Sequence, residues 1–258
     1  MKPPISPLLY AALLFLGMLI LLEVGRRIGV RRRPNESESV RGSLGTVEGA
    51  VFALFGLMVA FTFSGAATRF NEKRMLIAEE VNTIGTAYLR LHLVPQEAQP
   101  ALQELFRRYL DSRLETYRKL PNMEAAKPEM AKSKRLQEEI WTEAVDATLL
   151  PKSHPDAGKL LLPAHNNMID ITTTRTMALQ VHPPTIIYAL LFGLGLICSL
   201  LAGYRMSSGQ RSWLHIAGFT VMTVIIVYVI LDAEYPRSGL IHLETADQLL
   251  VELRDSMK

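Results

Sequence analysis

Cysteine is almost absent from this sequence: a single residue, Cys198, occurs among 258. A chain with one cysteine forms no intrachain disulfide and has no Cys-x-x-Cys pair of the kind found in zinc and redox sites. Cys198 lies inside a long apolar run, where a free cysteine usually acts as a small packing residue. We therefore expect Cys198 to be buried and unreactive.

Motifs of catalysis and cofactor binding are also missing. No histidine is spaced four residues from a second ligand in a metal-binding pattern, and the sequence has neither a glycine-rich phosphate loop nor a nucleophile elbow. The six histidines are His92, His154, His165, His182, His215 and His242. The sequence thus predicts no catalytic residue, no metal site, no cofactor and no enzyme.

Two groups of polar side chains come nearest to a chemical site. Glu79 and Glu80 are neighbours on an expected helix, so their side chains point about 100° apart and cannot face each other as an acid/base pair. The second group consists of Asn166, Asn167, Asp170, Thr172, Thr173, Thr174 and Arg175. It could bind a ligand, but a solvated helix face is the more common case. We interpret both groups as solvated side chains on helix surfaces.

No basic stripe with interleaved aromatic residues is present, although the pI is near 9.0. This argues against a nucleic-acid partner. The densest basic group follows the first apolar run, which is the usual place of a membrane topology signal. Its members are Arg26, Arg27, Arg31, Arg32 and Arg33.

Charged residues are scarce in four segments, 8–22, 47–65, 184–204 and 213–231. Each is close to the roughly 20 residues that cross a hydrocarbon core, and such segments satisfy their backbone in lipid as helices. Buried core helices can also be apolar all round, but four in one chain favour membrane spans. The first could be a signal peptide, yet Glu23-Val24-Gly25-Arg26-Arg27 replaces a small-residue cleavage site. We predict a retained anchor and a lipid bilayer as partner.

Arginine counts predict the orientation. Six arginines lie in the loop 25–44, and Arg205 and Arg211 flank the loop 205–212, so both loops should be cytoplasmic. Both termini and the segment 66–183 would then lie on the other side. The predicted order is a first span (1–24), a second (45–65), an extramembrane domain (66–183), a third (184–204), a fourth (213–231) and a C-terminal turn with an amphipathic helix (232–258).

Proline is absent between Pro34 and Pro95, so one helix of about 45 residues, or roughly 70 Å, can leave the bilayer and continue into water. One face of it repeats at heptad spacing. Where lipid is expected, this helix-packing seam consists mainly of glycine and alanine: Gly49, Ala53, Gly56, Ala60, Phe63 and Ala67. Where water is expected, its side chains are mainly bulky: Phe70, Arg74, Ile77, Val81, Ile84, Tyr88 and Leu91. Small residues let membrane helices approach closely. The seam could meet helices of its own chain or copies of itself about a symmetry axis.

A neighbouring face of the same helix carries Phe52, Phe55, Val59 and Phe63, with the polar Thr62 and Ser64 near its end. Rings of such residues around an axis can gate a pore by dewetting, so these six are pore-lining candidates. A stripe of this kind more often faces lipid or a core. Glu48 is expected at the helix start, where the helix dipole favours a carboxylate.

Three more amphipathic helices are predicted after Pro95, within 99–120, 129–150 and 158–180, with short polar linkers at 121–128 and 151–158. Together with the extended second helix they form a helical bundle. Thr245 and Gln248 give a capping-box spacing that opens a final helix. This helix is expected to lie on the bundle or at the membrane surface, and we favour a terminal helix that covers the bundle core. The fold class is therefore all-α: a polytopic membrane protein with four transmembrane helices and an extramembrane helical bundle built on a long extension of the second.

Four stretches resemble blocks of the bestrophin-like family of bacterial membrane proteins: "GTVEGAVFALFGLMVAFTFSGAATRF", "AEEVNTIGTAYLRL", "NNMIDITTTRTMALQ" and "LDAEYPRSGLIHL". The resemblance extends from Gly45 to Leu243. By analogy with bestrophins it implies a homo-oligomer, a pentamer, that conducts chloride or another small anion through a pore lined by the second span. It also implies a bacterial cytoplasmic (inner) membrane. Bestrophins keep their large insert in the cytosol, whereas the arginines here predict a periplasmic one, and we take the orientation from the arginines.

Two functions remain open from the sequence. The first is an oligomeric bestrophin-like anion channel. The alternative is a non-conducting membrane scaffold or sensor that couples its helical bundle to the membrane and a partner. Tight Gly/Ala packing, which would leave no lumen, favours the second, whereas the family analogy favours the first.

Overall fold

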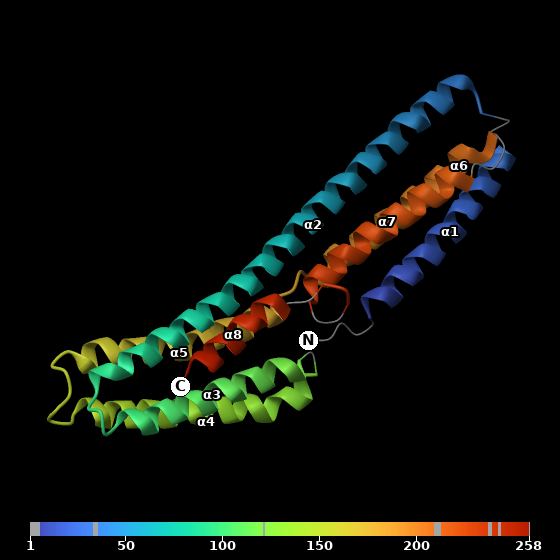
Figure 1. The fold of residues 1–258 in the computed structure, drawn as a ribbon. Coiled ribbons are helices and arrows are strands. Elements are labelled where there is room, and N and C mark those ends of the chain that lie inside the picture. The colour runs from blue at the N-terminus through green and yellow to red at the C-terminus, as the bar shows by residue number, and fades with distance from the viewer. Residues whose placement is uncertain are drawn as a thin grey trace. The chain divides into compact units, whose positions relative to one another are not determined.

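The computed structural model describes residues 6–32, 36–120, 122–208, 213–236, 239–241 and 244–257. These residues are helical with short connections, and the fold contains no strand within them (Figure 1). Predictions that fell on Arg33, Pro121 and Arg211 lie outside the described residues, as do the side chain of Thr245 and part of the turn that follows Pro236.

Four helices in the described part of the chain are long and apolar enough to span a membrane, which confirms the predicted fold class. They are α1 (Pro7–Arg32), α2 (Glu38–Leu89), α6 (Thr185–Arg205) and α7 (Trp213–Glu234). Helix α2 has 52 residues without a break and continues into the 3-10 turn η2 (Arg90–Leu93). The single long helix predicted from the missing prolines is therefore present, and it begins at Glu38, ahead of Gly45.

The other helices are α3 (Gln99–Lys119), α4 (Met123–Thr148), α5 (Ala157–Gln180), the 3-10 turn η3 (Met206–Ser208) and α8 (Glu244–Ser256). The linker predicted at 121–128 is wrong, because α4 already starts at Met123. The Asn122 side chain accepts a hydrogen bond from the Ala125 backbone N–H (3.3 Å) and so caps this earlier start. Pro128 is tolerated inside the helix, where it removes one backbone donor near the N-terminus.

The chain divides into two compact units. We call Phe70–Val181 with Leu240–Lys258 the bundle unit, and Pro3–Arg69 with His182–Gly239 the membrane unit. In the bundle unit α3 and α4 lie side by side (Figure 1). Its core buries large side chains from α2, η2, α3, α4, α5 and α8, among them Ile84, Leu91, Phe106, Tyr109, Leu136, Ile140, Leu161, Met168 and Leu250. Burial of each is worth about 1.5–3 kcal/mol.

The C-terminal helix α8 covers this core, as predicted. Leu250 is fully buried, and Met257 is nearly so. Arg254 Nε donates to Asp111 Oδ1 at 2.7 Å, which ties the outer face of α8 to α3.

In the membrane unit α1 and α6 run parallel and touch through glycine (Figure 1). A Cβ atom added at Gly25 would lie 2.0 Å from the Leu200 carbonyl oxygen, and one added at Gly203 would lie 1.9 Å from the Leu22 carbonyl oxygen. The two backbones are therefore in direct contact, as small residues permit in membrane helices. Cys198 on α6 is fully buried, which confirms its expected packing role.

Candidate functional site: the membrane-spanning half of helix α2

Helix α2 is embedded in its own chain along only one side of its membrane-spanning half. Phe55 is 7% exposed and packs over Gly195 of α6, where an added Cβ would lie 3.6 Å from the ring. Phe52 meets Phe219 of α7 edge to face, with ring centroids 5.9 Å apart. Val59 and Thr62 continue this side and are half-buried. The structure thus gathers four of the six pore-lining candidates on the side of α2 that faces α6 and α7.

The remaining two candidates, Phe63 and Ser64, are exposed. Thr62 does not offer its hydroxyl proton to a passing ion, because Oγ1 lies in hydrogen-bond contact with the backbone carbonyls of Met58 (2.8 Å) and Val59 (3.0 Å). Pore lining by these six residues stays a prediction. The structure adds that Phe63 and Ser64 are left exposed by their own chain.

Most residues of the helix-packing seam are buried or half-buried in the bundle unit, whereas most are exposed in the membrane unit. In the bundle unit Ile77, Ile84 and Leu91 are buried, and Val81 and Tyr88 pack against the core; Phe70 packs on Ile77. In the membrane unit Gly49, Ala53, Gly56 and Ala60 are all exposed. A Cβ added at Gly49 or Gly56 meets nothing within 4 Å. The bulky half therefore packs within its own chain, whereas the Gly/Ala half is uncovered in the single chain.

Glu48 anchors the N-terminal half of α2 to α6. It lies well inside α2, so the helix-start explanation expected from the sequence is wrong. Glu48 is 7% exposed as a residue, and its carboxylate accepts from Arg205 Nη1 at 3.2 Å. Because Arg205 is largely exposed, this ion pair sits at the edge of the unit and fixes α2 against the end of α6.

The bundle unit contains a buried ionic cluster that the sequence interpretation missed. Glu80 is fully buried; it accepts from Arg113 Nε at 2.6 Å and from the Tyr117 hydroxyl at 2.8 Å, and it also pairs with Arg175. The guanidinium group of Arg175 lies over the Tyr117 ring, 4.0 Å from its centroid. The expectation that Glu80 and Arg175 are surface residues is therefore wrong.

Burial alone would raise the pKa of Glu80, but the charges of Arg113 and Arg175 outweigh it and hold the pKa at about 2. Burial raises the pKa of Tyr117 as well, so its phenol stays protonated and can donate to Glu80. The cluster is a permanently charged junction of α2, α3 and α5. A signal existed: Glu80 lies three residues after Ile77 and four before Ile84, on the stripe that faces the core.

Nothing in the described residues groups three or more metal-ligating side chains. A family model described as the bestrophin-like domain matches residues 12–247 of the chain, which confirms the resemblance found in the sequence motifs. Comparisons with curated proteins and with solved structures found no match.

Proposed function

The chain belongs to the bestrophin-like family, and from that premise we propose that it assembles into a homo-oligomer that conducts small anions such as chloride along an axis lined by α2. One observation carries the proposal: Gly49, Ala53, Gly56 and Ala60 form a face of a membrane-spanning helix that its own chain leaves uncovered. Copies of the same face can cover it about a cyclic axis. A pentamer follows from family analogy.

The chemistry of this face suits a dewetting gate. It carries no charge, and it ends at the exposed Phe63 and Ser64. Narrow apolar constrictions exclude water and ions until they widen. Selectivity for anions would be set at the mouths of the path, and Phe63 would form its narrowest ring.

Chloride flux from vesicles tests the proposal. Wild-type oligomers should release chloride well above empty vesicles. Ala53→Phe narrows the proposed path and should reduce flux about tenfold or more, because a dewetting barrier rises steeply with constriction. Leu54→Phe is the matched control, since Leu54 is exposed on another side of α2, and its flux should stay within about twofold of wild type. If folded wild-type oligomers release no chloride, the channel proposal is contradicted.

A non-conducting scaffold is the second candidate, and the same Gly/Ala face supports it. Small residues allow helix backbones to touch and leave no lumen. In that case wild-type oligomers would form without flux, and Ala53→Phe would dissociate them. Oligomer mass, measured by light scattering beside the flux, separates the two functions.

The proposed location is the bacterial inner membrane, with both termini and the bundle unit on the periplasmic side. We expect Glu115→Cys to react with a membrane-impermeant maleimide in intact spheroplasts, because the Glu115 side chain on α3 is 42% exposed. Arg31→Cys, near the end of α1, should react only after lysis. Both cysteines are introduced into a Cys198→Ala variant, which lacks the one native thiol. The reverse labelling pattern would show that the orientation is opposite to the one proposed.

A further inference from the structure

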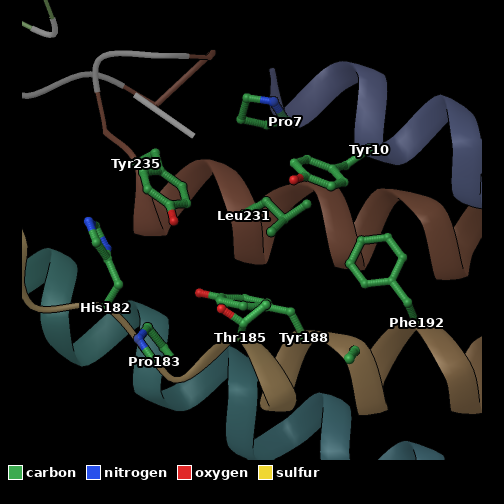
Figure 2. A pocket seen from close by; sticks show the side chains of 10 residues that line it. Pro7, Tyr10, His182, Pro183, Thr185, Tyr188, Phe192, Leu231 and Tyr235 are labelled. Atoms are coloured by element: carbon green, nitrogen blue, oxygen red, sulfur yellow. The ribbon is translucent and has the colours of Figure 1, made fainter. Parts of the chain in front are cut away.

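A pocket of about 380 Å³ lies within the membrane unit, between the first turns of α1 and α6 and the last turn of α7 (Figure 2). The volume falls in the range of small-molecule sites. Most of its wall is apolar or aromatic. The lining residues are Pro7, Tyr10, His182, Pro183, Thr185, Tyr188, Ala189, Phe192, Leu231 and Tyr235.

Several polar side chains converge on this pocket. Figure 2 shows the hydroxyl groups of Tyr10, Tyr188 and Tyr235 turned toward the space between the helices. Among the described residues, the Tyr188 hydroxyl and His182 Nε2 are shielded from solvent and have no hydrogen-bond partner. An unpaired buried polar atom costs about 1–3 kcal/mol. A ligand oxygen that reaches these atoms would relieve that cost.

The His182 ring is held firmly by its other nitrogen. Nδ1 lies 3.0 Å from Glu234 Oε1, and the Tyr235 ring lies against the imidazole with centroids 4.6 Å apart. Glu234 is fully buried and also accepts from Arg69 Nε at 2.9 Å. Because Nδ1 faces a carboxylate, this nitrogen carries a proton. Nε2 is then the ring nitrogen left to hydrogen-bond with a ligand.

The lining residues decide the charge of the ligand. Among the described residues that line the pocket there is no lysine or arginine, and the nearby Arg69 is already paired with Glu234, so an anion entering the pocket would compete with Glu234 for its cation. An unpaired charge in such an apolar site is strongly disfavoured. The ligand is therefore neutral, with one hydroxyl that hydrogen-bonds to Nε2 of His182 and to the Tyr188 hydroxyl.

The walls decide its shape. Tyr10 and Phe192 lie with their ring centroids 6.0 Å apart along one side, and aromatic walls favour a planar ring. We propose that this pocket binds a neutral, membrane-soluble phenol or quinol, with its hydroxyl at His182 and Tyr188 and its ring between the aromatic side chains. The apolar tail would leave along Leu231 and Phe192.

Calorimetric titration of the full chain in lipid nanodiscs tests the proposal, with empty nanodiscs subtracted. The probe is 4-pentylphenol, which should saturate at one site per chain. Tyr188→Phe removes one hydroxyl and should weaken binding about three- to tenfold, as for one hydrogen bond. Ala189→Phe fills the pocket and should abolish saturation. Leu190→Phe is the matched control, because Leu190 is exposed on α6 and does not line the pocket, and it should bind as wild type does.

Two further ligands show which part of the probe provides the affinity. Pentylbenzene has the same ring and alkyl chain without the hydroxyl, and hexanoate carries a negative charge. Saturable binding of 4-pentylphenol that exceeds both supports the proposal. Equal binding of pentylbenzene, preferential binding of hexanoate, or unchanged phenol binding by Ala189→Phe would each overturn it. The readout is binding, so it is independent of anion flux.

Discussion

Glu80→Gln is expected to destabilise the bundle unit by about 3–5 kcal/mol, because it leaves the buried guanidinium groups of Arg113 and Arg175 without their counter-charge. The measurement is denaturant unfolding of the purified full chain in detergent, followed by circular dichroism. Glu79→Gln is the matched control. Glu79 is adjacent but exposed, so its replacement should change stability by less than about 0.5 kcal/mol.

The Glu80 carboxylate also makes the stability of the bundle unit depend on pH. The pKa of Glu80 is lowered from 4.5 to about 2 in the folded chain. Its contribution to stability is thus fully present above about pH 4.5 and is lost as the pH falls toward 2. Wild type should lose more stability across this window than Glu80→Gln. Equal stability of Glu80→Gln and Glu79→Gln at neutral pH would show that the cluster does not hold the bundle together.

Gly203→Val is expected to disrupt the membrane unit more than any lipid-facing substitution. An added Cβ would lie 1.9 Å from the Leu22 carbonyl oxygen, so α1 and α6 must move apart along their parallel contact. Overpacking of this kind typically costs about 1–3 kcal/mol or more, because the neighbour is backbone and cannot rotate away. The measurement is the thermal midpoint of the full chain in detergent, read by size-exclusion chromatography.

Gly218→Val provides the comparison on α7, where an added Cβ meets nothing within 4 Å. Its midpoint should stay within a few degrees of wild type. A Gly203→Val protein that elutes and melts like Gly218→Val would mean that α1 and α6 do not touch at this glycine.

Sequence patterns predicted the parts of the fold in which apolar residues are separated from polar ones by their contact with lipid or water. Four apolar runs identify the spans, and the bulky spacing of Ile77, Ile84 and Leu91 identifies the face of α2 that packs in the bundle core. In water the contrast between apolar and polar residues marks a buried face. The same reasoning could have placed Glu80 in the core, because it occupies that stripe, but its charge suggested the surface.

In the membrane half of α2 this contrast is missing, since residues on every side are apolar. Phe55 is buried on α6 while Phe61 is 68% exposed, and nothing in their chemistry distinguishes them. The contact of Gly25 with α6 was equally hidden, because a glycine shows its role only when the facing backbone is known. In lipid, the shape of the side chains determines which helix faces pack together, and the spacing of apolar residues in the sequence does not show this shape.

Cross-linking of α2 in native membranes tests the central claim most directly, that its Gly/Ala face meets copies of itself. In a Cys198→Ala background, Ala53→Cys treated with a short bismaleimide should yield covalent species of twice the chain mass. Leu190→Cys, exposed on α6, should remain at the single-chain mass. If Ala53→Cys stays monomeric under conditions in which its thiol is shown to react, the face meets lipid instead, and no axis is formed by α2.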